Sequence, residues 1–168
     1  PRSGLPAGRL IENRLREIIR EKGWALLDAR VNSFEPFKDV YGFVTGDDVL
    51  RFTAMLIGEV VDELGSTSDF SGHAGGDNFI IITSDEKSAA IKARLKERFD
   101  TEVQTHYNFM DRQQGFMQAP AADGTTTKVP FMTMSVGVVS PSVQSFADIR
   151  EITELAAEAR RQDSAAGG

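Results

Sequence analysis

The sequence contains no cysteine, which excludes disulfide bonds, thiolate metal sites and cysteine nucleophiles. It also lacks an apolar run of about eighteen residues, so no segment predicts a transmembrane helix. The basic and then apolar pattern of a signal peptide is missing from the N-terminus. The net charge of −6 disfavours broad contact with nucleic acid or anionic lipid, because such partners need a positive field. We therefore expect a cytoplasmic domain without nucleic-acid or membrane contacts.

Length and composition are those of one globular domain. The 168 residues are 40% hydrophobic and 26% charged, enough to build one hydrophobic core. The stretches Pro1 to Pro6 and Ala165 to Gly168 read as cuts from a longer chain. We expect residues 1–168 to form a single domain of a multidomain signalling protein.

Apolar spacing and glycine positions predict the secondary structure. Ile11, Leu15, Ile18 and Ile19 recur with helical spacing, and Met132 to Val138 alternates as a strand does. The predicted helices cover 8–22, 47–64, 84–99 and 146–161; the predicted strands cover 24–31, a glycine-interrupted hairpin over 69–83, and 131–139; a long hairpin loop is predicted over 108–129. This order predicts an α/β (α+β) fold, with a mixed, mainly antiparallel sheet of about five strands covered by helices, and a small extra hairpin.

Two acidic residues in glycine-rich surroundings are candidates for ligand binding. Asp77 follows Gly75 and Gly76, where a ligand can approach the backbone closely, and it can hold a cation or a base edge. Asp47 stands near a predicted helix start, where it can cap the helix or accept hydrogen bonds from a guanine. Each also has a plain structural interpretation, as a turn residue and a helix cap. His73 is interpreted as an ordinary strand residue rather than a catalytic one.

Five short stretches, taken together and in order, carry more information than any one alone: Gly4-Leu5-Pro6 with Arg9-Leu10, Phe34 to Asp39, Tyr41-Gly42 with Gly46-Asp47, Gly75 to Phe79, and Met134 to Val138. In this order they resemble the GGDEF family of nucleotidyl cyclases over nearly the whole chain. The resemblance implies a palm-like cyclase fold. Phe43 and the Gly72-His73 pair resemble a divergent branch often fused to cyclic di-GMP phosphodiesterase (EAL) domains.

The resemblance also implies where the catalytic metal site should be. The family's metal ligand positions fall on Arg30, Val31 and Asp77, with a neighbouring acidic position at Asn32, and its catalytic glutamate falls on Asn78. Magnesium needs hard oxygen ligands, whereas a guanidinium is always charged and cannot ligate a metal. A neutral amide is also a poor general base. From the signature Gly75-Gly76-Asp77-Asn78-Phe79 we therefore expect no catalytic residues, and we expect no bound metal.

Two further expectations concern the charged residues on the predicted strand 24–31. At ~4 Å and an effective dielectric of ~20, Arg30 repels a divalent ion by about 8 kcal/mol. We expect Arg30 to take the metal's place and to pair with Asp77, which otherwise lacks its usual cation. Asp28 points to the same face of the strand, roughly 6–7 Å away, and is the one carboxylate that can substitute.

The resemblance places the nucleotide contacts at six positions, which are Ser33, Phe34, Lys38, Asp47, Gly75 and Gly76. Lys38 stands where the family has a guanine-binding asparagine, and Asp47 keeps the other base contact. The family's inhibitory product site is degraded, because its arginine falls on Ser66 and only Asp69 remains. Arg160 and Arg161 lie near the family's late phosphate-binding cations but out of register.

These residues favour a non-catalytic GGDEF-like signalling domain in a cyclic di-GMP pathway, acting as a regulatory, nucleotide-sensing or dimerisation module. One alternative is an active diguanylate cyclase with atypical site residues, using Mg²⁺. Another is a purely structural domain with no ligand. The expected partners are flanking sensor or EAL-type domains, GTP or cyclic di-GMP, and a second copy of the chain.

Overall fold

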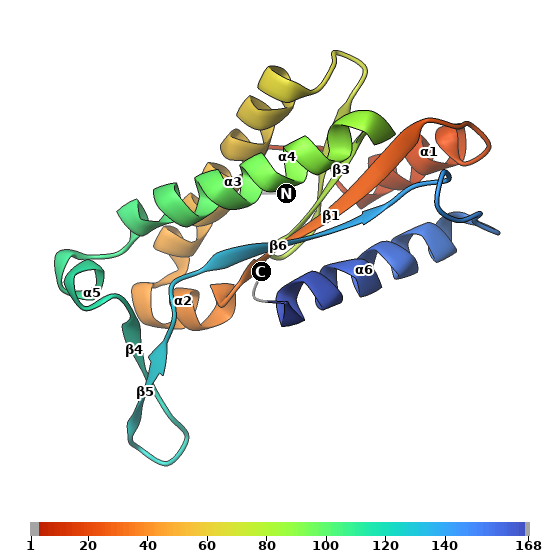
Figure 1. Ribbon diagram of the computed structural model, residues 1–168. Helices are drawn as coiled ribbons and strands as arrows, with labels where there is room; N and C mark the ends of the chain where they lie inside the picture. The colour runs from red at the N-terminus through yellow and green to blue at the C-terminus, as the bar shows by residue number, and fades with distance from the viewer. Residues whose placement is uncertain (1–3, 167–168) are drawn as a thin grey trace.

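A computed structural model describes residues 4–166. Four strands form the central sheet in the order β2-β3-β1-β6 (Figure 1). They are β1 (Trp24–Asn32), β2 (Phe70–Gly75), β3 (Asn78–Ser84) and β6 (Thr133–Val139). All three strand pairings are antiparallel. The predicted fold class is confirmed, with four strands in the sheet and a separate two-stranded hairpin.

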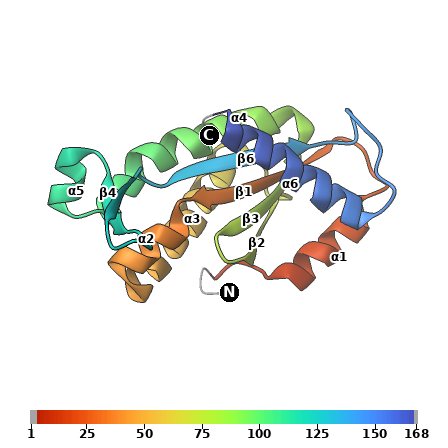
Figure 2. The ribbon, with the colours of Figure 1, turned by 90° about the horizontal axis from the view of Figure 1, so that it is seen from below.

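Helices cover both faces of the sheet, so the molecule has three layers (Figure 2). The helices α1 (Gly8–Ile18) and α6 (Ile149–Ala165) pack on one face, and α3 (Phe43–Leu64) and α4 (Asp85–Glu102) pack on the other. Alternation along β1 supplies both cores, since Leu26 joins the α1–α6 side and Leu27 the α3–α4 side. Within residues 4–166 no helix is both long and apolar enough to span a membrane.

Several boundaries differ from the sequence prediction. An unpredicted helix, α2 (Phe34–Tyr41), precedes α3, and Gly42 separates the two with a φ of 97°, a conformation that glycine tolerates. The region 108–129 holds a short helix, α5 (Phe109–Gln114), before the hairpin of β4 (Met117–Pro120) and β5 (Thr126–Val129), and a 3₁₀ turn (Val103–His106) follows α4.

One face of β1 changes from apolar to polar along its length. Trp24 and Leu26 are buried under α1 and α6, whereas Asp28, Arg30 and Asn32 follow on the same face. The Asn32 amide donates to Thr133 Oγ1 and Ser135 Oγ at 3.0 and 2.6 Å. The polar end of β1 also contacts the C-terminal half of α6, where Arg160 pairs with Asp28. The candidate site lies at this end of the strand.

Helix α6 is held against β6 by a close backbone contact and by ion pairs. A Cβ added at Gly137 would lie 2.2 Å from the backbone nitrogen of Arg160, so the helix approaches the strand where only glycine fits. Asp163 of α6 accepts a hydrogen bond from Val136 N at 2.8 Å and pairs with Lys92 and Lys96 of α4. Burial alone would raise the pKa of Asp163, but these bonds hold it below the ordinary value. Asp163 thereby satisfies a backbone amide on the outer edge of β6, the last strand of the sheet.

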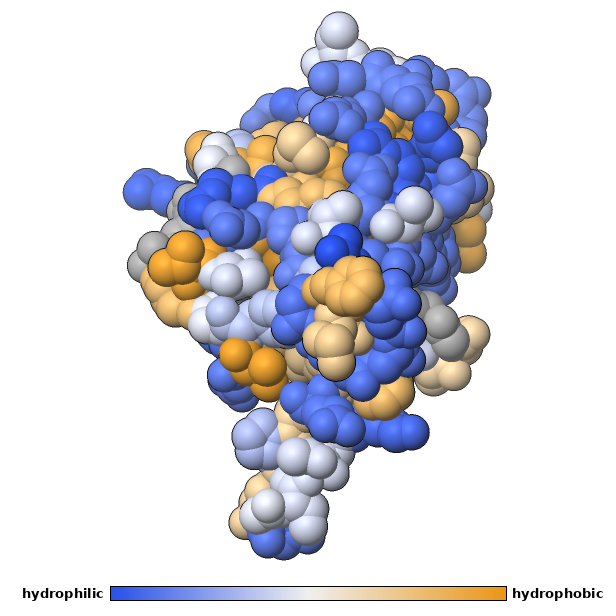
Figure 3. All heavy atoms as spheres, turned by 90° about the vertical axis from the view of Figure 1, so that its left-hand side faces the viewer, coloured by the Kyte–Doolittle hydropathy of each residue, from blue (hydrophilic) through white to orange (hydrophobic). Residues whose placement is uncertain are grey.

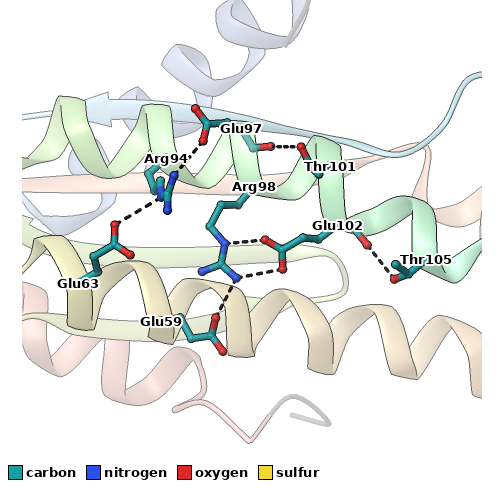
Figure 4. A network of polar contacts seen from close by, with 8 residues as sticks. All are labelled: Glu59, Glu63, Arg94, Glu97, Arg98, Thr101, Glu102 and Thr105. Atoms are coloured by element: carbon teal, nitrogen blue, oxygen red, sulfur yellow. Dashed lines mark hydrogen bonds and ion pairs between the residues drawn. The ribbon is translucent and has the colours of Figure 1, made fainter.

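Elsewhere the surface holds charged networks and dispersed apolar residues. At the end of the molecule that carries α2 and α5, apolar residues form separate groups among hydrophilic ones rather than one continuous surface (Figure 3). Between α3 and α4, Arg98 pairs with Glu59 and Glu102 at 2.9 and 2.6 Å, and Arg94 joins Glu63 and Glu97 (Figure 4). Arg98 in turn lowers the pKa of Glu102.

Candidate functional site

The tip of the β2–β3 hairpin places the glycine pair and Asp77 at the polar end of β1. Gly75 and Gly76 both have positive φ, 135° and 52°, which suits glycine in a tight turn. His73 is buried, its ring stacks on Phe79 with centroids 4.4 Å apart, and its Nε2 lies 2.8 Å from the Gly76 carbonyl oxygen. His73 is thus the strand residue expected from the sequence, and it braces the turn.

Arg30 and Asp77 form an ion pair at this tip. The Nε of Arg30 donates to Asp77 Oδ1 at 2.9 Å, and the two side chains are 48% and 14% exposed. The register explains the contact, since Arg30 pairs with Asn78 across the sheet and Val31 N donates to the Asp77 carbonyl oxygen. The predicted Arg30–Asp77 pair is confirmed.

A second ion pair lies deeper on the same face. Asp28, which is 4% exposed, has its Oδ1 3.0 Å from the Nε of Arg160 on α6. The Asn78 amide donates to the same Oδ1 at 2.5 Å and to the Ala29 carbonyl oxygen at 2.9 Å. Burial raises the pKa of Asp28, while Asn78 and Arg160 act against that rise.

Asn78 and Asp28 are both engaged in contacts within the fold. The amide at the family's catalytic position is used in two hydrogen bonds, and the one carboxylate able to substitute for the missing ligand is already paired. Among residues 4–166, no three His, Asp or Glu side chains gather closely enough to hold a metal ion. Arg30 stands beside the remaining acid, Asp77. The donor set therefore does not fit the divalent cation that the family's chemistry requires.

A pocket of about 540 Å³, called here the arginine pocket, opens beside these pairs. Its lining includes Arg30 and Asp77 at the hairpin, Arg160 and Arg161 on α6, and Ser33 and Glu35 at the start of α2. Ser33 has a φ of 64° and makes no side-chain cap bond, so the first amides of α2 are not capped by it. The arrangement offers cationic and amide donors on one surface.

A second pocket, of about 470 Å³ and called here the Asp47 pocket, lies on the other side of Phe34 and Glu35, which line both. It brings together Asp47, Lys38, Gly75 and Gly76. Lys38 pairs with Glu35 at 3.2 Å and its side chain passes closely over Gly46. Five of the six expected nucleotide positions therefore line one pocket, and Ser33 lines its neighbour.

The capping role considered for Asp47 is wrong. Helix α3 begins at Phe43 with Gly42 as its N-cap residue, so Asp47 lies in the second turn, past the first-turn amides that a cap satisfies. Asp47 instead lines the pocket named after it.

The two positions expected at the degraded inhibitory site, Ser66 and Asp69, lie in one turn beside a pocket of about 350 Å³. Asp69 accepts hydrogen bonds from Ser66 N, Ser66 Oγ and Thr83 Oγ1 at 3.2, 2.9 and 2.7 Å. Ser66 and Asp69 thus bond to each other and to the neighbouring strand, a structural use of the two positions.

Arg160 and Arg161 are site residues that sequence reasoning did not assign. They belong to the arginine pocket, although their spacing does not match the family's late cations. No local signal identifies them, because the register of α6 on the sheet is set by the contact at Gly137.

Comparison with known proteins gives one family and one fold. The family model for "Diguanylate cyclase, GGDEF domain" matches residues 3–168. No curated protein sequence matches the chain. The GGDEF domain of PA1120 (TpbB or YfiN) from Pseudomonas aeruginosa superposes with a TM-score of 0.70 at 19% identity, over 96% of this chain and 86% of that one.

Two other solved structures have ligands or partners in their descriptions. The GGDEF domain of DgcB from Caulobacter crescentus, in complex with c-di-GMP, gives a TM-score of 0.68 at 21% identity, over 99% of this chain and 90% of that one. The diguanylate cyclase SiaD from Pseudomonas aeruginosa, in complex with its activator SiaC, gives 0.71 at 20% identity, over 99% of this chain and 58% of that one. At these identities the likeness establishes the fold.

Proposed function

The chain belongs to the GGDEF family, and we propose that it is a non-catalytic member that regulates cyclic di-GMP signalling in response to a guanine nucleotide. The observation that carries the proposal is the Arg30–Asp77 ion pair, with its 2.9 Å contact between Nε and Oδ1. It lies where the family's metal ligand positions fall.

The loss of catalysis follows from the charge at this position. Joining two GTP molecules requires a metal to activate a hydroxyl and to offset phosphate charge, and a metal requires clustered carboxylates. Here Arg30 brings a fixed positive charge, and Asn78 is held by Asp28 and the Ala29 carbonyl. Neither group can act as a general base at neutral pH.

A response to nucleotide is supported by the two adjacent pockets. Asp47 offers a carboxylate to the two-donor edge of a guanine, and Lys38 offers a cation beside it. The arginine pocket shares the Phe34 and Glu35 wall and presents guanidinium groups to phosphate. One nucleotide lying across this wall would place its base and its phosphates in surroundings of matching chemistry.

The regulatory output is proposed to pass to other domains. In a cytoplasmic multidomain protein, the natural receivers are flanking sensor or EAL-type domains, or a second copy of the chain. Cyclic di-GMP is a further candidate ligand of the same pathway. Helix α6 is the element best placed to transmit nucleotide binding to other domains. It contributes Arg160 to the pocket, and its Asp163 accepts a hydrogen bond from β6.

Two measurements on the purified chain test the proposal. Incubation with GTP and Mg²⁺ or Mn²⁺, followed by chromatography, is expected to yield no cyclic di-GMP. Calorimetric titration with GTP in metal-free buffer is expected to give a binding isotherm. Product formation would establish the active-cyclase alternative, and a flat titration without product would establish the purely structural one.

A further inference from the structure

Arg30 and Arg160 use only one edge of their guanidinium groups within the protein. Arg30 contacts Asp77 through Nε, and Arg160 lies against Asp28 through Nε, at 2.9 and 3.0 Å. The terminal nitrogens of both groups make no hydrogen bond to any residue between 4 and 166. A guanidinium carries five N–H donors in a planar fork, so the terminal edge of each remains able to bind an oxyanion.

The guanidinium groups of Arg30 and Arg160 belong to residues that line the same pocket. Arg30 and Arg160 line the arginine pocket together with Arg161, against two acidic side chains, Glu35 and Asp77. Arg160 is only 9% exposed, and its Nε lies beside the buried carboxylate of Asp28. The pocket therefore presents three guanidinium groups to a ligand, in a chain whose net charge is −6.

We propose that the arginine pocket binds the phosphate groups of a nucleoside phosphate without a divalent cation, with the Arg30 guanidinium in the place of the metal. The inference rests on the proposed nucleotide response and adds its ionic requirement. It follows from the misfit between the donor set and a metal.

The physical basis is the geometry of the guanidinium–phosphate contact. Guanidinium and phosphate form two parallel charge-assisted hydrogen bonds, which a point-like cation does not. The Arg30–Asp77 pair competes only weakly, because Arg30 is 48% exposed and exposed pairs contribute little. Mg²⁺ is then a competitor, since it complexes phosphate in solution while finding no ligand set in the pocket.

The test is calorimetry with inorganic pyrophosphate and, separately, GTP, each in buffer with EDTA. Both are expected to bind, and addition of Mg²⁺ in excess of EDTA is expected to weaken pyrophosphate binding. A tighter affinity for GTP than for pyrophosphate assigns the ligand to a whole nucleotide, and equal affinities assign it to the phosphate groups alone.

Three variants identify the groups responsible. Arg30→Gln is expected to weaken pyrophosphate binding by about tenfold or more, the equivalent of one charged hydrogen-bonding group. Asp77→Asn is expected to strengthen it several-fold, because it releases Arg30 from its competitor. Arg150→Gln is the matched control and should leave binding unchanged, since Arg150 lies on α6 outside the pocket with its side chain 81% exposed.

Three results would overturn the inference: no pyrophosphate or GTP binding in EDTA, binding that appears only with Mg²⁺, or an affinity unchanged in Arg30→Gln. Thermal unfolding of each variant shows that it is folded, which the half-exposed position of Arg30 leads us to expect. Formation of cyclic di-GMP, or absence of GTP binding in EDTA, marks failure of the proposed function itself. GTP binding without pyrophosphate binding, or an affinity unchanged in Arg30→Gln, marks failure of this inference alone.

Discussion

At the scale of single residues, the two ion pairs on β1 should differ in what they contribute to stability. The Arg30–Asp77 pair is half-exposed, and such pairs contribute about 1 kcal/mol or less. The Asp28–Arg160 pair is buried, with residue exposures of 4% and 9%. Removing one partner of a buried pair leaves an uncompensated charge, which costs far more than losing a surface pair.

Arg160→Met should therefore lower the free energy of unfolding by about 3–5 kcal/mol at pH 7. Burial raises the pKa of Asp28, so its stability contribution is fully present at low pH and is lost as pH rises through its folded pKa. The loss in Arg160→Met should accordingly shrink as pH falls. Urea denaturation at several pH values measures this. Arg161→Met, on the exposed neighbour, is the control and should change stability little.

Asn78→Glu should destabilise the fold rather than restore catalysis. The substitution removes the donor that lies 2.5 Å from Asp28 Oδ1 and places a second carboxylate beside it. We expect a loss of about 2 kcal/mol or more at pH 7, and no cyclic di-GMP synthesis. Urea denaturation of Asn78→Glu against Asn78→Gln, which has the same length without the charge and leaves the Asp28–Arg160 pair intact, checks the cause. If both lose equal stability, repulsion from Asp28 is not responsible.

At the scale of elements, the tightest packing is between helix α6 and Gly137 of β6. Gly137→Ala would place a Cβ 2.2 Å from Arg160 N and 2.5 Å from Ala156 O, both backbone atoms. Because backbone cannot rotate away, we expect a loss of about 3 kcal/mol. Gly58→Ala in α3 is the matched control: its Cβ meets nothing within 4 Å, so it should stabilise the helix by about 1 kcal/mol. Thermal unfolding of the two variants compares them, and similar effects would contradict the packing of α6 described above.

The turn after α4 should make stability depend on pH. His106 packs on Phe52 with ring centroids 4.9 Å apart, and burial lowers its pKa, while Asp48 acts in the opposite direction. A lowered histidine pKa means that the unfolded chain binds the proton more readily. Stability should therefore fall as pH drops below about 6.5, histidine's ordinary value, and level off below the folded pKa. Urea midpoints between pH 5 and pH 8 should show this dependence, reduced in His106→Gln; an equal slope in both would assign it to other groups.

The elements were predictable where apolar spacing decides them. The segments around β1, α4 and β6 carry clear periodicities, and their predicted positions agree with the structure to within a few residues. Helix α2 was missed because the stretch Phe34 to Asp39 was interpreted as a family motif and not by its apolar spacing. Pro36, its third residue, is tolerated in a first turn.

The Arg30–Asp77 contact was predictable from the resemblance, which places both residues at the family's metal ligand positions. In the structure, the register of β1 against β3 brings the two side chains together. The contribution of Arg160 was not predictable, because it depends on how far α6 slides along the sheet. The hydrogen bonds of Asn78 were missed for a related reason, since they require knowing that Asp28 is buried and paired.

At the scale of the whole molecule, the chain has the GGDEF fold, and the polar end of β1 holds the ion pairs Arg30–Asp77 and Asp28–Arg160, which we propose stand in place of a metal cluster. The net charge of −6 makes weak, scattered attraction of divalent ions to the surface unavoidable. The polar end of β1 and the tip of the β2–β3 hairpin should nevertheless bind divalent ions no better than the rest of the surface.

The most direct test is therefore to titrate Mn²⁺ into the ¹⁵N-labelled chain and to record paramagnetic broadening of the backbone amides. Broadening is expected near exposed acidic clusters, with the amides of Val31, Asp77 and Asn78 no more affected than the rest. Arg30→Asp/Asn78→Asp, which adds carboxylates at both family positions, is the positive comparison and should broaden those amides first. Preferential broadening of Val31, Asp77 and Asn78 in the unaltered chain would contradict the account, because it would place a divalent ion where Arg30 is proposed to stand.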